Sequence, residues 1–129
     1  MFELRRAREP VILARDFYTL LGWYETVMGF RRVQLVDGGY RYAIVEGPGG
    51  IRIGLGEAEP MGVTAPDAAN GTVRLQWEVH DLAGFMSWFA EESGTIAFGP
   101  NRDAADGFLY GAIRDPEGNE IWLVDEHCP

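Results

Sequence analysis

The sequence of 129 residues contains a single cysteine, Cys128, close to its C-terminus. One cysteine excludes an internal disulfide, so nothing requires an oxidising compartment. Long apolar runs are also missing, because no stretch approaches the ~20 residues that span a bilayer and no signal-peptide core stands near the N-terminus. These absences predict a cytoplasmic protein with no membrane partner.

Positive charge is scarce as well. Lys and Arg together number 11 against 20 Asp and Glu, which gives a formal net charge of −9. Like charge repels nucleic acid, and no basic stripe is present that could release counterions. The short basic segment RRAR, at 5–8, is interpreted as a solvated arm. We therefore expect no nucleic-acid partner.

The residues that are abundant indicate a turn-rich globular protein. The sequence holds 17 Gly and 7 Pro, and 47% of its residues are hydrophobic. This composition is typical of a soluble domain with many turns rather than of a helical bundle. A chain of this length fits one domain over residues 1–129, which would bury roughly two-thirds of the surface of the unfolded chain.

Two helix candidates repeat half a chain length apart. The first is DFYTLLGWYETVMG, from Asp16 to Gly29, and the second is DLAGFMSWFAEESG, from Asp81 to Gly94. In both, an Asp can accept the free N–H groups of the first turn, and the final Gly suits the left-handed position after a helix. Apolar residues between them follow helical spacing.

The segments around the two helices repeat too. Strands are predicted before each helix, at 9–15 and 74–80, and three strands after each. The first three are 31–36, 40–46 and 51–56, and the second three are 95–98, 108–114 and 120–125, with a loop at 99–107. The Pro- and Gly-rich segment 57–71 is predicted to be a linker. Module one therefore covers 9–56 and module two covers 73–125.

The order of elements predicts an α+β fold made of two βαβββ modules. A single helix covers one face of a four-stranded sheet and leaves the other face bare. Two curved mixed sheets joined side by side would surround an open cleft, which is where small ligands bind.

The chain resembles the vicinal oxygen chelate superfamily, which includes glyoxalase I, bleomycin-resistance proteins and extradiol dioxygenases. The resemblance rests on the paired modules, on ILARDFYTLLGWYETVMGF and on the closing RDPEGNEIWLV, and it extends from Glu9 to Asp125. It implies the fold of that superfamily. It does not by itself imply one activity, because the scaffold serves both enzymes and drug-binding proteins.

In its catalytic members, the resemblance implies, a divalent metal is held at the start of each module's first strand and in a module's last strand. The matching residues here are Glu9, Arg74 and Trp122, and the matching closing residue of module one is either Arg52 or Ile53. Only Glu9 can ligate a cation, since Arg offers no lone pair and Trp and Ile offer no donor atom. We therefore expect no metal and no other cofactor.

Alternation along the strands predicts which side chains face the cleft. The cleft side of the module-two strands receives Arg74, Gln76, Glu78, Trp122 and Val124. Glu9 and Arg74 could equally pair with each other, and Trp122 could either stack on a ligand or only fill space. The aromatic residues of the hairpins could rim the cleft, namely Tyr40, Tyr42, Phe108 and Tyr110. Asp115 and Glu117 are interpreted as turn residues.

These residues predict a metal-independent small-molecule binding protein, similar to the bleomycin-resistance branch and a homodimer like its members. Aromatic walls suit a flat or cationic ligand, whereas Arg74 and Arg52 favour a carboxylate or phosphate group. The expected ligand-binding residues are therefore of both kinds: Glu9, Arg52, Arg74, Gln76, Glu78, Tyr42, Tyr110 and Trp122. The alternatives are a metal-dependent lyase, isomerase or dioxygenase, an enzyme with Glu9 as general base, and a regulatory subunit with a degenerate cleft.

Overall fold

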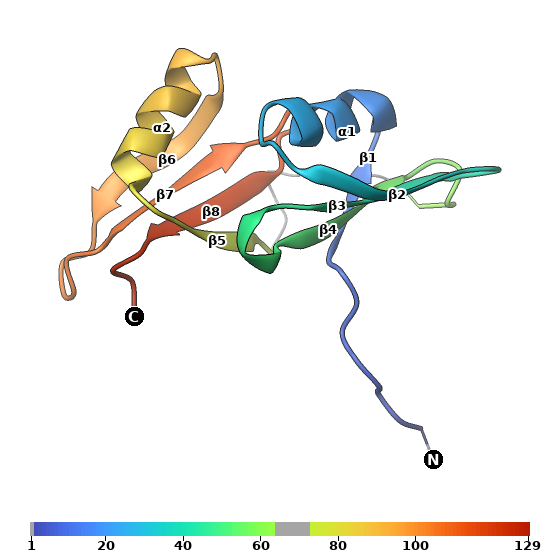
Figure 1. The fold of residues 1–129 in the computed structure, drawn as a ribbon, viewed down its shortest axis with the longest axis horizontal. Helices are drawn as coiled ribbons and strands as arrows, with labels where there is room; N and C mark the ends of the chain where they lie inside the picture. The colour runs from blue at the N-terminus through green and yellow to red at the C-terminus, as the bar shows by residue number, and fades with distance from the viewer. Residues whose placement is uncertain (1, 64–72) are drawn as a thin grey trace. The chain divides into compact units, whose positions relative to one another are not determined.

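The computed structural model describes residues 2–63 and 73–129. They fall into two compact units, 1–65 and 66–129, each of which contains one helix packed on one four-stranded sheet (Figure 1). The α+β class and the repeated βαβββ order are confirmed. The predicted linker lies largely outside the described residues, and the cleft expected between the modules stays a prediction.

The first unit runs through β1 (Val11–Ala14), α1 (Phe17–Thr26), β2 (Arg31–Asp37), β3 (Arg41–Glu46), a 3-10 turn at Pro48–Gly50 and β4 (Arg52–Glu57). The strand order is β1-β4-β3-β2, with β1 parallel to β4 and the other pairs antiparallel. Buried side chains on one face of this sheet meet the apolar side of α1, and they include Ile12, Ala14, Val45, Ile53 and Leu55.

The second unit repeats this arrangement with β5 (Leu75–Val79), α2 (Leu82–Glu91), β6 (Thr95–Arg102), β7 (Leu109–Arg114) and β8 (Glu120–Asp125). The strand order is β5-β8-β7-β6, and β5 runs parallel to β8. Trp77, Ile113, Ile121 and Leu123 are buried on the face that α2 covers. In each unit we call the face opposite the helix the open face.

Several predicted element boundaries are wrong, among them the following three. The strand predicted at 95–98 continues to Arg102, because two register shifts carry β6 past Gly99 and Pro100. Glu57, assigned to the linker, is the last residue of β4. After α2 the left-handed residue is Ser93, with φ 65°, rather than Gly94. Gly94 is required for space instead, since a Cβ there would overlap the Phe89 ring.

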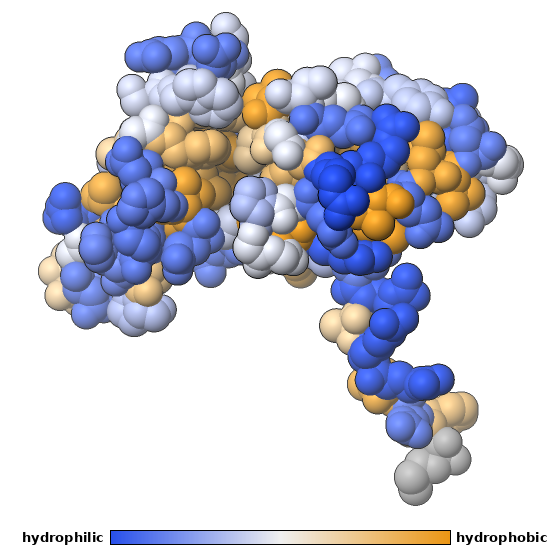
Figure 2. Space-filling view, in the orientation of Figure 1, coloured by the Kyte–Doolittle hydropathy of each residue, from blue (hydrophilic) through white to orange (hydrophobic). Residues whose placement is uncertain are grey.

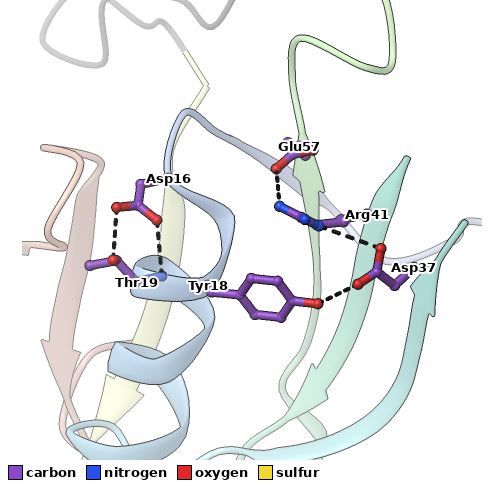
Figure 3. A network of polar contacts seen from close by, with 6 residues as sticks. All are labelled: Asp16, Tyr18, Thr19, Asp37, Arg41 and Glu57. Atoms are coloured by element: carbon purple, nitrogen blue, oxygen red, sulfur yellow. Dashed lines mark hydrogen bonds and ion pairs between the residues drawn. The ribbon is translucent and has the colours of Figure 1, made fainter. Parts of the chain in front are cut away.

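A polar network ties α1 to the strands beneath it (Figure 3). The Tyr18 hydroxyl donates to Asp37 Oδ2 at 2.6 Å, and Arg41 pairs with both Asp37 and Glu57. The Arg41 guanidinium also lies 5.0 Å from the centre of the Tyr18 ring. The network therefore connects α1 with β2, β3 and β4 at the exposed margin of the core.

The residues before β1 form an extended arm that leads away from the first sheet (Figure 1). Most of its surface is hydrophilic, and isolated apolar side chains interrupt it (Figure 2). Phe2 and Leu4 are fully exposed. Among the described residues, no helix is both long and apolar enough to traverse a bilayer.

Asp16 caps α1 and gives the first test of the fold. Its Oδ1 accepts from the Thr19 backbone N–H at 3.3 Å and its Oδ2 from the Thr19 hydroxyl at 2.8 Å. We expect Asp16→Ala to lower the free energy of unfolding by about 1 kcal/mol, because the cap satisfies an otherwise unpaired donor. Urea denaturation followed by circular dichroism measures this loss. Asp16→Asn keeps an acceptor oxygen and should retain most of the stability, so equal losses in both variants would contradict the capping role.

Candidate functional site

Residues that pair across strands share a face, so the register decides which side chains reach each open face. In the first unit Glu46 pairs with Arg52 and Tyr42 with Gly56, which places Tyr42, Glu46 and Arg52 on the open face. Ile53 points the other way and is buried against the helix side, with 1% of its surface exposed.

The register also corrects the proposed counterpart of Trp122. Val11 and Gln76 each stand five residues before the capping aspartate of their unit, and they pair with Gly54 and Trp122. The counterpart of Trp122 is therefore Gly54, and both alternatives taken from the sequence, Arg52 and Ile53, are wrong. A side chain at position 54 would overlap the Tyr42 hydroxyl, so only glycine fits under this ring.

Glu9 lies just before β1 among hydrogen-bond donors. Its Oε1 accepts from the Tyr42 hydroxyl at 2.9 Å, and its Oε2 lies 3.8 Å from Arg8 Nε and 4.0 Å from Arg52 Nε. Arg52 also pairs with Glu46 at 2.8 Å. A bond from its own backbone N–H, then the Tyr42 hydroxyl and the arginines, lowers the pKa of Glu9 despite burial. Glu9 is thus a weakly basic, well-paired carboxylate.

Tyr42 is the other half of this contact. Burial, followed by the hydrogen bond to Glu9, raises the pKa of Tyr42 to about 12. Its phenol therefore stays protonated and donates to the carboxylate across the physiological range.

In the second unit the corresponding contacts centre on Glu120. Its Oε2 accepts from Trp122 Nε1 at 2.9 Å and from Arg74 Nε at 3.3 Å, and its Oε1 from Arg114 Nη2 at 3.1 Å. The Trp122 bond and the two arginines lower the pKa of Glu120 although burial opposes them. The Glu120 and Arg74 side chains are only 17% and 18% exposed, so solvent screens this pair weakly.

The two units have ion pairs at corresponding strand positions, but the charge at each position is opposite in sign. The order Glu9, Arg52, Glu46 in the first unit corresponds to Arg74, Glu120, Arg114 in the second. Each central residue forms ion pairs with both flanking residues. Arg52 and Arg74, expected to meet an anionic ligand, are therefore each paired with carboxylates of their own unit.

An aromatic pocket of about 310 Å³ opens on the sheet of the second unit. Its walls come from three strands and the end of a loop, namely Trp122, Tyr110, Phe98 and Phe108. The Phe98 ring meets Trp122 and Tyr110 edge-on, at centroid distances of 6.2 Å and 6.4 Å. The polar lining consists of Gln76, Asp103 and Cys128. Trp122 remains 43% exposed, so its indole is accessible to a ligand.

The structure brings three of the predicted binding residues together at this pocket: Gln76, Tyr110 and Trp122. Arg74 is linked to Trp122 through Glu120, which accepts a hydrogen bond from each of them. Glu78 is exposed two residues beyond Gln76, on the same face. Glu9, Tyr42 and Arg52 form the separate cluster of the first unit, and a pairing between Glu9 and Arg74 stays a prediction.

Several site residues are absent from the sequence-based predictions. Glu120 could have been found, because it stands two residues before Trp122 and must share its face. Phe98 could not, since the register shifts on both sides of it break simple alternation. Asp103 belongs to a loop, where no periodicity applies. Asp115 behaves as expected: its carboxylate accepts from Glu117 and Asn119 and fixes the turn.

The side chains at the metal positions of the family do not fit a divalent cation. Glu9 is bonded to a phenol and flanked by arginines, Arg74 is a cation itself, and Trp122 offers only an N–H. Across residues 2–63 and 73–129, no three His, Cys, Asp or Glu side chains are grouped to share a metal.

Glu120→Gln tests the contact that orients Trp122. A carboxylate with a lowered pKa stabilises the folded state above its unfolded pKa of about 4.3, and this contribution is lost as the pH falls through the folded value. We expect the variant to be less stable by about 1–2 kcal/mol at pH 7, and the difference from the parent protein to shrink below about pH 4. Urea denaturation at several pH values measures both. Glu91→Gln, on an exposed residue of α2, is the control, and a pH-independent difference for Glu120→Gln would contradict the assignment.

Comparison with known proteins places this arrangement in a family. The family model of the Glyoxalase/Bleomycin resistance protein/Dioxygenase superfamily matches residues 9–123. The comparison with curated proteins finds no match. A structure from the mobile metagenome of V. Pseudocholerae is 26% identical, with 98% of each chain covered and a TM-score of 0.66.

Two further structures share the fold at lower identity. A glyoxylase/bleomycin resistance protein/dioxygenase domain from Frankia sp. EAN1pec is 19% identical, with 95% of this chain and 93% of that chain covered and a TM-score of 0.72. A glyoxalase I mutant from Zea mays is 17% identical with a TM-score of 0.73, over 93% of this chain and 47% of that one. The chain belongs to the Glyoxalase/Bleomycin resistance protein/Dioxygenase superfamily.

Proposed function

We propose that this chain is a metal-independent small-molecule binding protein, which sequesters a drug or metabolite in the aromatic pocket of its second unit. The observation that carries the proposal is the exposed indole of Trp122, which stands among Phe98, Tyr110 and Phe108 where catalytic relatives would hold a metal ligand. A pocket of about 310 Å³ lies at the lower end of the range for drug-sized ligands.

The orientation of Trp122 supports stacking rather than mere filling of space. Its N–H is already bonded to Glu120, and the edge of Phe98 limits its rotation. A wall that is ordered before the ligand arrives loses little conformational entropy on binding. Flat ligands gain most from such a wall, because their whole face meets the indole.

The polar clusters favour binding over catalysis. A general base needs a pKa near the working pH, but the pKa of Glu9 is lowered and its carboxylate already accepts from Tyr42. Glu120 is likewise engaged by three donors. A metal-dependent lyase, isomerase or dioxygenase would need ligands that replace these contacts, and it remains the alternative that the metal measurement below tests.

We also propose that the protein is a cytoplasmic homodimer and that it binds neither nucleic acid nor membrane. Antibiotic resistance would be one outcome of drug sequestration. The net charge of −9 supports the exclusion of both polyanionic partners. Exposed apolar side chains outside the pocket, such as Phe2 and Leu4, support self-association. Sedimentation velocity that gives only monomer up to high concentration would overturn the dimer.

Trp122→Leu should weaken the binding of a planar probe, acridine, by about fivefold or more, since an aromatic pair contributes about 1 kcal/mol beyond the area that it buries. Isothermal titration measures the dissociation constants. Trp88→Leu is a matched control, because Trp88 on α2 is 42% exposed against 43% for Trp122. Equal acridine affinity in all three proteins would overturn the proposed pocket.

Protein purified without chelators should contain well under one equivalent of Mn, Fe, Co, Ni or Zn by elemental analysis, and EDTA should leave acridine binding unchanged. This follows from the donor set, which offers a divalent cation one carboxylate beside an arginine. A near-stoichiometric metal, with loss of acridine binding when EDTA removes it, would favour the metal-dependent enzyme instead.

A further inference from the structure

Asp103 is the acidic group of the aromatic pocket, and its loop holds it in place. It follows β6, and its Oδ2 accepts from the backbone N–H groups of Ala105 at 3.1 Å and Asp106 at 2.7 Å. Its own backbone N–H donates to Phe108 O at 2.8 Å. Within the described part of the chain, Oδ1 accepts no hydrogen bond. The pocket thus contains a fixed carboxylate with one oxygen available.

The basic side chains nearby are directed elsewhere. Arg74 and Arg114 are bonded to Glu120. Arg102 pairs in register with Leu109 and lines a different hollow, beside Asp81 and Asp125. Among the residues that the structure describes, no arginine, lysine or histidine lines the pocket. A ligand there meets one negative charge and no positive one.

The aromatic walls of the pocket also favour a cationic ligand. The face of an indole or phenol ring carries partial negative charge, so it attracts a cation and repels an anion. Trp122, Tyr110, Phe98 and Phe108 together surround the space next to Asp103. The net charge of −9 adds a weaker long-range attraction for cations.

A second polar group stands at the other edge of the sheet. Gln76 lies on β5, whereas Asp103 follows β6, and β8 and β7 separate these edge strands. With strands about 4.8 Å apart, the two edges lie roughly 14 Å from each other. The Gln76 amide can both donate and accept, so it can meet a carbonyl, hydroxyl or amine at the far end of an extended ligand.

We propose that this pocket selects planar aromatic cations, with the ligand's positive group against Asp103 and its ring system on Trp122. The proposal rests on the proposed function, since it names the ligand class of the same pocket. It assigns Asp103 as the residue that selects the charge of the ligand. The sequence had instead suggested that Arg74 and Arg52 bind an anionic ligand.

Three probes of one shape and different charge test this selection at neutral pH. They are 9-aminoacridine, which is a cation, acridine, which is neutral, and acridine-9-carboxylate, which is an anion. We expect the cation to bind about tenfold more tightly than acridine, since a charge-assisted contact is roughly twice as strong as a neutral one, and the anion to bind most weakly. Titration of the full-length protein measures each dissociation constant.

Asp103→Asn removes the charge but keeps a side-chain oxygen for the two loop N–H groups. We expect this variant to bind 9-aminoacridine and acridine with nearly equal affinity, while its binding of acridine stays unchanged. Asp106→Asn is the matched control, because it removes one charge from the same loop outside the pocket lining and should keep the preference for the cation.

Cys128 reports where the probes bind, because it is the only cysteine and it lines the pocket. Bound 9-aminoacridine should slow the alkylation of Cys128 by iodoacetamide in the parent protein. Binding without protection, equal affinity for cation and neutral probe, or a preference that survives Asp103→Asn would each overturn the selection of cations. Failure of all three probes to bind would instead overturn the proposed function itself.

Discussion

The open face of the second unit is organised by one carboxylate. Glu120 accepts from Arg74 just before β5, from Arg114 on β7 and from the indole of Trp122 on its own strand, so it connects three neighbouring segments of the sheet. These bonds engage both arginines and orient the indole. Without them, Trp122 would have no polar partner for its N–H, and the basic side chains would be available to an anion. The aromatic pocket depends on this arrangement.

In the first unit the same register carries different side chains. Its central residue is Arg52, which forms ion pairs with Glu9 and Glu46, so the signs of the charges are inverted. At the position of Trp122 it has Gly54, over which the Tyr42 ring lies. The phenol fills the space and is held by Glu9. Two units with one topology therefore differ in their chemistry through a few open-face residues.

The repeat, the capping aspartates and the alternation along the predicted strands were enough to predict two βαβββ modules, since each is a local pattern. The partners of Arg74 and Arg52 were not predictable, because cross-strand register joins residues far apart in sequence. The same holds for the counterpart of Trp122, which required the parallel pairing of β1 with β4 and of β5 with β8.

The sequence by itself determined the α+β class with its two modules, the faces of most strands and the side of the sheet on which Trp122 lies, because periodicity and turn residues act over a few positions. Only the tertiary structure decided the charge of the candidate site. It paired the predicted anion-binding arginines with Glu120 and Glu46 and brought the loop residue Asp103 beside four aromatic rings. Ion pairs and pocket walls form between distant segments, so their partners follow from strand register and loop geometry rather than from local sequence.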